Sequence, residues 1–179
     1  MNLNKLTQRS IDAINAAQQQ AAAHAHPEVT ALHLLDALLK QEEGLVLQVL
    51  KRLGVDDDTI VAEVEKGLAS FPHQSGGQLH PSNDFTQVIY RAESELKGFG
   101  DEYVSVEHLL LAMLDVKSTA QEILRANGVK RNDILKVLTA IRGKSRVTDD
   151  NPESKYAVLD KYSRDLTKIA REGKLDPVI

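Results

Sequence analysis

The sequence predicts an all-α protein built from two copies of one four-helix repeat. The segment from Val29 to Leu39, VTALHLLDALL, returns 75 residues later as VSVEHLLLAML, from Val104 to Leu114. Apolar residues elsewhere recur with the 3.6-residue period of a helix, and no run alternates over a strand's length. Hydrophobic residues make up 42% and charged residues 27% of the 179 residues, as in ordinary globular domains. We therefore expect one globular domain made of two pseudo-symmetric repeats.

The repeated segment looks like the start of a buried helix. Six of its eleven paired positions are identical, among them His33 and His108. Thr30 and Ser105 are N-cap types, whose side-chain oxygen accepts a hydrogen bond from a first-turn N–H. Three residues later, where a capping box has Glu or Gln, each copy has histidine, which we expect to bond back to the cap. A metal site is the weaker interpretation, because neither histidine has a second ligand one turn away.

Each half opens with a further helix. Residues 4–25 include AAQQQAAA, a run of strong helix formers, and Pro27 stops this helix. The counterpart runs from Ser82 to Lys97 and is closed by Gly98 and Gly100. Its apolar face is large, whereas the equivalent face of the first half is small and consists of Ser10, Ala13, Ile14, Ala17 and Ala21.

A third helix is predicted in each half, at 47–53 and 120–126. Gly54 and Gly128 follow these helices at the position where a left-handed residue ends a helix. The third helices are therefore expected to end at equivalent places in the two repeats.

The fourth helices are predicted at 60–68 and 134–141. Asp58 and Asn132 are their expected N-caps. These caps are 74 residues apart rather than 75, so one residue was gained or lost between the second and third helices.

The domain boundaries follow from composition. Repeat one covers 1–70 and repeat two covers 79–142, joined by an exposed loop that contains Gly76-Gly77. Residues 143–155 are polar and are expected to form a flexible linker. A short amphipathic helix is predicted within 156–179.

Charge and composition disfavour several classes of partner. A net charge of −4 argues against a dominant nucleic-acid role. No apolar stretch approaches the roughly 20 residues that a membrane span needs, and the first ten residues contain no apolar core of a signal peptide. The chain has no cysteine, which excludes disulfides and thiolate metal sites and fits a reducing cytosol. We expect a cytoplasmic protein without a membrane or nucleic-acid partner.

Catalysis has no support in the sequence. Gly143-Lys144-Ser145 matches the end of a phosphate-binding loop, but Leu138 stands where the first glycine is needed, and the tripeptide follows a helix rather than a strand. His24-Ala25-His26 is better explained as a frayed helix end than as a metal site. No catalytic residue, metal or cofactor is therefore expected in this chain.

A binding surface remains. Two pseudo-symmetric halves form a groove between them, and helical grooves capture amphipathic helices or extended peptides. Two or three buried apolar side chains of a partner would contribute ~1.5–3 kcal/mol each before ordering costs. The expected binding is weak and has little sequence preference.

The chain also resembles a known family. HLLDALL and EHLLLAML on their 75-residue period are similar to the double repeat of the Clp ATPase N-terminal domain. The tail RVTDDNPESKYAVLDKYSRDLTKIAREGKLDPVI resembles the linker and the start of the first AAA+ module in the ClpB family of disaggregases. This resemblance implies a substrate-recognition domain that passes unfolded or aggregated polypeptide to a hexameric threading ring, in protein refolding under heat stress. It implies that the parent protein is an AAA+ ATPase that uses ATP and Mg, forms a homo-hexamer and cooperates with the DnaK system.

The resemblance also implies a polar set near the substrate groove. Its members match Thr7, Ser82, Asp101 and Glu107 in this chain. Each of the four is equally well explained as a helix cap, and one residue can both cap a helix and contact a substrate.

The apolar wall of the groove would come from Phe85, Val88 and Ile89, which also fit a place in the core. Two other functions remain open. An adaptor-docking domain, as in the ClpA and ClpC branch, would share the fold and differ in partner. A helical enzyme would need a clustered pair of carboxylates or histidines, and no spacing in the sequence forces one.

Overall fold

The computed structural model describes residues 3–143 and 145–153, and in this part of the chain most residues are helical. A short 3-10 helix at Leu3–Lys5 comes first. The helices of the first repeat are α1 (Gln8–Ala23), α2 (Ala31–Leu39), α3 (Leu45–Leu53) and α4 (Asp57–Ala69). Those of the second are α5 (Asn83–Ser94), α6 (Leu96–Phe99), α7 (Val106–Asp115), α8 (Thr119–Ala126) and α9 (Arg131–Arg142). The predicted all-α fold of two four-helix repeats is confirmed, with α6 as a short extension of α5.

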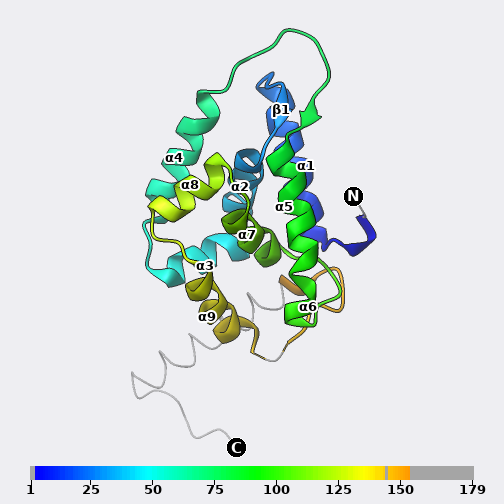
Figure 1. The fold of residues 1–179 in the computed structure, drawn as a ribbon, viewed down its shortest axis with the longest axis vertical. Helices are drawn as coiled ribbons and strands as arrows, with labels where there is room; N and C mark the ends of the chain where they lie inside the picture. The colour runs from blue at the N-terminus through cyan, green and yellow to red at the C-terminus, as the bar shows by residue number, and fades with distance from the viewer. Residues whose placement is uncertain (1–2, 144, 154–179) are drawn as a thin grey trace, which may run out of the picture.

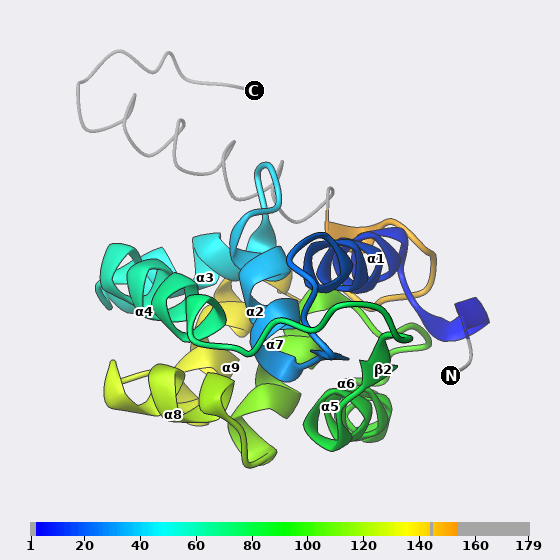
Figure 2. The ribbon, with the colours of Figure 1, turned by 90° about the horizontal axis from the view of Figure 1, so that it is seen from above.

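The repeated helices α2 and α7 form the centre of the domain (Figures 1 and 2). Every residue of α2 is buried, as is every residue of α7 from Val106 to Leu114. Helix α1 packs on α2, and α5 packs on α7. The later helices cross between the repeats, since α3 packs on α9 and α4 packs on α8. The two halves therefore share one aliphatic core.

The histidine capping boxes form as predicted. The backbone N–H of Thr30 donates to His33 Nδ1 at 3.0 Å, and that of Ser105 donates to His108 Nδ1 at 2.8 Å. Because Nδ1 accepts in each ring, a neutral ring carries its hydrogen on Nε2, which points away from the cap.

Several helix ends differ from the predictions. Helix α1 begins at Gln8 rather than at residue 4, because Thr7 caps it by accepting from the N–H of Ser10. The helix predicted from Ser82 to Lys97 is divided at Glu95 into α5 and α6, and only Gly100, with a φ of 67°, ends it. A left-handed residue of this kind favours glycine.

The caps of the fourth helices are also corrected. Asp56, not Asp58, caps α4 by accepting from the N–H of Thr59 at 3.1 Å. Lys130 rather than Asn132 precedes α9. Nevertheless, α4 and α9 begin at residues 57 and 131, so the predicted 74-residue register holds.

Two short parallel contacts tie the repeats together. Strand β1 (Glu28–Val29) pairs with β2 (His80–Pro81), and an isolated bridge joins Leu6 to Val104. The N–H of Ser82 donates to the Val29 carbonyl at 2.9 Å, and the N–H of Thr7 donates to the Val104 carbonyl at 3.0 Å. These bonds are equivalent under the 75-residue repeat. Each half thus holds the start of the other half's first helix.

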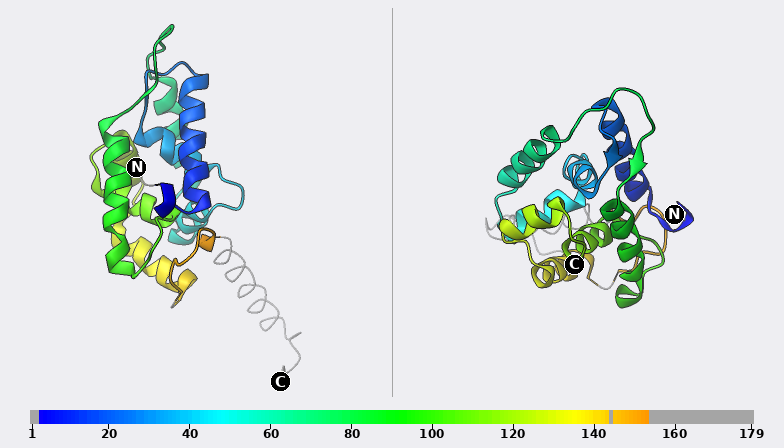
Figure 3. Two further views of the ribbon diagram at one scale, coloured as in Figure 1. Left: turned by 90° about the vertical axis from the view of Figure 1, so that its right-hand side faces the viewer. Right: turned by 45° about the horizontal axis from the view of Figure 1, so that its top comes forward.

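The sequence predicts a flexible linker after α9, but residues 145–153 of that segment contact the domain. It folds back beside the start of α1 (Figure 3). The side chains of Val147 and Glu153 are buried, and the N–H of Glu102 donates to the Val147 carbonyl at 2.8 Å. The helix predicted within 156–179 lies outside the described residues. Among the helices of the described part, none is long and apolar enough to cross a membrane.

Candidate functional site

Three of the four predicted polar residues gather around the N-terminal ends of α1 and α7. Thr7 caps α1, Asp101 lies in the loop before α7, and Glu107 lies in the first turn of α7. Glu153 joins them, since its Oε1 accepts from Thr7 Oγ1 at 2.6 Å and from the N–H of Val106 at 3.2 Å. We call Thr7, Asp101, Glu107 and Glu153 the polar cluster.

Ser82 lies in the other half. It caps α5 and accepts from the N–H of Phe85 at 3.2 Å, and its hydroxyl donates to Asp84. Asp84 Oδ1 in turn accepts from the N–H of Ala31 at the start of α2, at 2.9 Å. Ser82 therefore occupies the position equivalent to Thr7, and the structure does not bring it to the polar cluster.

Asp101 is fully engaged within the domain. Its carboxylate accepts from both terminal nitrogens of Arg142, at 2.6 and 3.0 Å, from His108 Nε2 at 2.8 Å, and from the N–H of Val147 at 2.9 Å. Burial alone would raise the pKa of Asp101, but the hydrogen bonds from His108, Arg142 and Val147 lower it to about 2. This carboxylate acts as a structural clamp between α7, α9 and the segment that follows α9.

Glu107 has the opposite environment. Its side chain is 0% exposed, and neither carboxylate oxygen has a hydrogen-bond partner among the described residues. Burial raises the pKa of Glu107. Burial and the nearby charge of Glu107 likewise raise the pKa of Glu153 to about 7, against the hydrogen bonds from Thr7 and Val106. Two carboxyl groups thus share one buried place, and protonation relieves their repulsion.

The predicted apolar wall needs correction. Phe85, Val88 and Ile89 are 3%, 0% and 6% exposed, so they belong to the core between α5 and α7. They offer no surface to a partner in this conformation. An amphipathic pattern identifies the apolar face of a helix, and here that face is covered by the domain itself.

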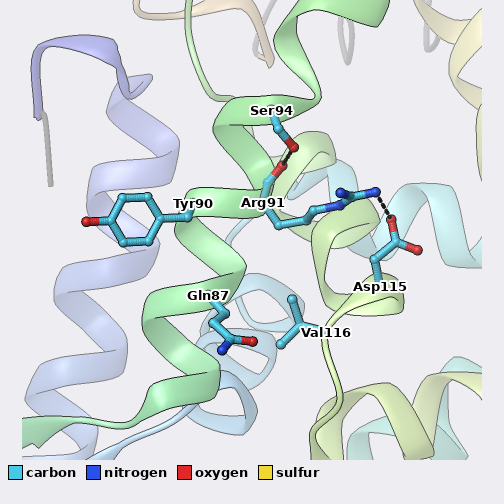
Figure 4. Close-up of a pocket in the computed structure, with 6 residues that line it drawn as sticks. All are labelled: Gln87, Tyr90, Arg91, Ser94, Asp115 and Val116. Carbon is cyan, nitrogen blue, oxygen red and sulfur yellow. Dashed lines mark hydrogen bonds and ion pairs between the residues drawn. The ribbon is translucent and has the colours of Figure 1, made fainter.

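An open cleft lies on the outer side of the same helix. It has a volume of about 620 Å³ and is lined by Gln87, Tyr90, Arg91, Ser94, Asp115 and Val116. Tyr90 is 66% exposed and is the one large hydrophobic side chain exposed in the described part of the chain. Arg91 reaches across to Asp115 at 3.3 Å, while Tyr90 projects to the other side (Figure 4). We call this the α5 cleft. Sequence reasoning missed it, although Tyr90 stands outside the apolar period of α5.

A histidine group occupies the position in the first half that corresponds to Asp101. His26 Nδ1 lies 2.8 Å from His33 Nε2, and the rings of His24 and His73 stack or tilt against His26 at 5.6 and 5.5 Å. Burial and the neighbouring histidines lower the pKa of His33 to about 4. Within the described residues no group of three such side chains has metal-binding geometry.

The family described as the Clp repeat (R) N-terminal domain matches residues 5–127. The chain belongs to this family. As a Clp N-terminal domain it is similar to the chaperone protein ClpB of Bacillus cereus, with 36% identity over 184 residues that cover 100% of this chain and 21% of the relative. ClpB of Corynebacterium efficiens is 42% identical over 176 residues, which cover 97% of this chain and 21% of that protein. The chain spans about a fifth of the length of these relatives.

Solved structures share the fold of this Clp N-terminal domain. The N-terminal domain of Hsp104 from Candida albicans has a TM-score of 0.74 at 24% identity, covering 83% of this chain and 99% of that one. The N-domain of ClpV from Vibrio cholerae has a TM-score of 0.64 at 23% identity, covering 79% of this chain and 87% of that one.

The surroundings of the tripeptide that begins at Gly143 differ from those of a phosphate-binding loop. Leu138, at the place of the first phosphate-loop glycine, lies inside α9 and is 1% exposed. Gly143 follows a helix rather than a strand.

Proposed function

We propose that this Clp N-terminal domain is the substrate-recognition part of a ClpB-type ATP-dependent disaggregase. It binds unfolded or aggregated polypeptide weakly and passes it to a hexameric ring during refolding under heat stress. The observation that carries this proposal is the identity of 36–42% with ClpB chaperones over almost the whole chain.

The α5 cleft is the exposed surface to which we assign the first contact with polypeptide, in place of the buried Phe85, Val88 and Ile89. Tyr90 offers an exposed aromatic face at the edge of the cleft, and Gln87 and Arg91 offer hydrogen-bond donors on its other side. An aromatic side chain of this kind supplies apolar contact area together with a polar tip. One such anchor supports weak binding with little sequence preference, because most of the interface would be polar and solvated.

A related fold supports capture of a peptide. One solved structure with a TM-score of 0.63 and 23% identity is described as a complex of a ClpV N-domain with a VipB peptide. In that protein, a Clp N-domain fold presents a peptide-binding surface. Helical domains of this kind use a groove between helices for the purpose.

The remaining properties belong to the parent protein. We propose that the parent is an AAA+ ATPase that uses ATP and Mg in modules beyond this chain, assembles as a homo-hexamer in the cytoplasm and works with the DnaK system. This domain would then contribute recognition and no catalysis. Neither a membrane nor a nucleic acid is needed for that role.

A second function is adaptor docking, as in protease-associated Clp proteins. The N-domain of the caseinolytic-protease-associated chaperone ClpD from Arabidopsis thaliana has a TM-score of 0.55 with this fold. The ion pairs that link Arg91, Asp115, Arg131 and Glu95 form a charged surface beside the α5 cleft, and such a surface suits a folded partner.

Titration with a permanently unfolded protein tests the proposal. Fluorescence anisotropy with a labelled, reduced and carboxymethylated protein measures the affinity of the 179-residue chain. Tyr90→Ala should weaken binding about tenfold, since it removes roughly 1–2 kcal/mol of apolar contact. Gln87→Ala in the α5 cleft should weaken binding less, and Gln19→Ala on the exposed side of α1 is its matched control.

The outcome also separates the two functions. Unchanged affinity in Tyr90→Ala and Gln87→Ala, with unchanged melting temperatures, would overturn the assignment of the α5 cleft. Failure of the wild-type chain to bind any unfolded protein, together with binding of a folded adaptor, would favour the docking function.

A further inference from the structure

The segment from residue 145 to residue 153 is docked on the polar cluster. Val147 is 0% exposed, and its N–H donates to Asp101 Oδ1 at 2.9 Å. Further on, the Asp150 carbonyl accepts from the N–H of Gln8 at 2.7 Å. Figure 2 shows this stretch passing beneath the start of α1. It is anchored to α1, to the loop before α7 and to α7 itself.

Glu153 takes a place whose equivalent, at the start of α2, is filled by a residue of the other repeat. There, Asp84 in the first turn of α5 accepts from the N–H of Ala31 at the start of α2. The residue equivalent to Asp84 is Arg9, which cannot accept a hydrogen bond at the start of α7. Glu153 supplies the missing carboxylate from outside both repeats, at 3.2 Å from the N–H of Val106. Because it comes from a segment outside both repeats, this ligand can leave without unfolding a repeat.

The docked arrangement is also opposed by charge. Glu107 has no partner for either carboxylate oxygen among the described residues, and Glu153 Oε2 has none either. Besides Glu107, the charged and titratable groups around this place are His108 on α7, Asp101 in the preceding loop and Arg142 on α9. From α1 the facing group is the neutral hydroxyl of Thr7. Two buried acids next to each other make a contact that a better ligand could displace.

We propose that residues 147–153 are an internal competitor that covers Thr7, Asp101 and Glu107. These residues are a second contact site for a polypeptide captured at the α5 cleft, and the polypeptide reaches them only after the segment has left. This proposal rests on the proposed function, since it names how that same domain is regulated. An extended peptide fits the vacated place chemically. Its carbonyl accepts from Thr7 Oγ1 and from the N–H of Val106, while its N–H donates to Glu107.

Protonation favours the docked state. The pKa of Glu153 is raised to about 7 when the segment is docked, compared with an ordinary value of 4.5. The docked form therefore holds the additional proton. Its stabilisation is fully present below pH ~4.5 and is lost as the pH rises through about 7. Release, and with it access for polypeptide, should be greater at pH 8 than at pH 6.

Two substitutions should move the equilibrium in opposite directions. Val147→Asp places a further charge at a buried position of the segment. Because burying that charge is costly, the segment should be released from the domain. Glu153→Gln keeps the shape of the protonated acid, and its amide can donate to Glu107, so it should hold the segment in place at any pH. Asp150→Asn is the matched control, because it also removes one acid, yet Asp150 contacts the domain only through its backbone carbonyl.

The experiment measures docking and binding separately in the 179-residue chain. Amide hydrogen exchange at Gln8 and Glu102, followed by NMR, reports docking, since both N–H groups donate to the segment. Anisotropy with the labelled unfolded protein at pH 6 and pH 8 reports binding. If the wild-type segment is docked nine-tenths of the time, Val147→Asp should raise the affinity by up to about tenfold, because the contribution of the polar cluster scales with the fraction of molecules in which the segment is released. Glu153→Gln should bind more weakly than wild type at pH 8, and Asp150→Asn should match wild type.

The possible failures are distinguishable. Equal affinity in wild type, Val147→Asp and Glu153→Gln would overturn the internal competitor and leave the proposed function standing. Absence of binding in all of them, although exchange at Gln8 and Glu102 shows release in Val147→Asp, would overturn the proposed function as well. If Val147→Asp no longer unfolds cooperatively, Glu153→Gln decides alone, because a gain in its affinity at pH 8 contradicts the proposal.

Discussion

His33 and His108 occupy the same place in the two repeats, but their Nε2 atoms face opposite partners. Nε2 of His108 lies 2.8 Å from an Asp101 oxygen, whereas Nε2 of His33 lies 2.8 Å from Nδ1 of His26. Residues 26 and 101 are equivalent under the 75-residue period. The partner of the buried histidine is therefore an acid, Asp101, in the second repeat and a base, His26, in the first.

Acid should destabilise the first repeat through His33. Burial, followed by the charges of His26 and His24, lowers the pKa of His33 to about 4 from an ordinary 6.5. The stability linked to this group is therefore full above pH 6.5 and is lost as the pH falls toward 4, by about 1–2 kcal/mol. Urea unfolding at pH 7.5 and pH 5 measures the loss. His26→Asp copies the second repeat and should reduce it; an equal loss in that variant would contradict the explanation.

The clamp between Asp101 and Arg142 should dominate the stability of the second repeat. Asp101→Asn leaves Arg142 buried without its acid, at a cost of about 3–5 kcal/mol. The pKa of Asp101 is about 2, so this stabilisation is lost only as the pH falls from 3.8 through 2, and the cost should be constant between pH 5 and pH 8. The control is Asp115→Asn, which breaks more exposed ion pairs and should cost ~0–1 kcal/mol in thermal unfolding. Asp101 is consequently a poor probe of polypeptide binding, because its loss disturbs the fold.

Glu107→Gln should stabilise the domain as the pH rises. Burial raises the pKa of Glu107, so the wild-type side chain carries a cost that grows above its ordinary pKa of 4.5. Glutamine has no such cost, so the variant should be more stable than wild type at pH 8, and its advantage should be smaller at pH 5. Glu102→Gln, at an exposed position in the preceding loop, should show no pH-dependent gain in the same denaturation experiments. A gain that is equal at both values of pH would contradict the burial of an ionisable carboxyl.

Phe85→Ala should act on folding and not on recognition. The ring is 3% exposed, and its removal should cost about 3–5 kcal/mol. Tyr90→Ala, one and a half turns away on the outer side of α5, should stay within ~0.5 kcal/mol of wild type. Differential scanning calorimetry distinguishes the two. If Phe85→Ala lost little stability and bound polypeptide more weakly, Phe85 would be part of the binding groove after all.

Local chemistry explains what could be predicted from the sequence. The capping of α2 and α7 by Thr30 and Ser105, and the return of His33 and His108, depend on residues within one helical turn. The glycine ends of α3 and α8 are equally local. The cap of α4 was misplaced because three aspartates stand in a row at 56–58, and each of them can accept from a first-turn N–H.

The site depended on contacts that no local pattern encodes. Thr7 meets Glu153 across 146 residues, and Asp101 meets Arg142 across 41. The polar composition of 143–155 predicts a linker, and Val147 alone gives too weak an apolar signal to indicate docking. Likewise, the apolar period of α5 predicted correctly which side chains face inward, but a periodic face does not tell whether the domain or a partner covers it.

The two parallel bridges make each half of the domain depend on the other half. The residues just before the first helix of each half pair with the backbone of the other half. Leu6 pairs with Val104, and His80–Pro81 pairs with β1. Half of this chain made alone would have an open strand edge and an uncovered central helix, and a second copy of itself carries the matching parts. A single repeat made alone should therefore associate with a second copy of itself, and its folding should depend on protein concentration. With both repeats in one chain, folding does not depend on protein concentration.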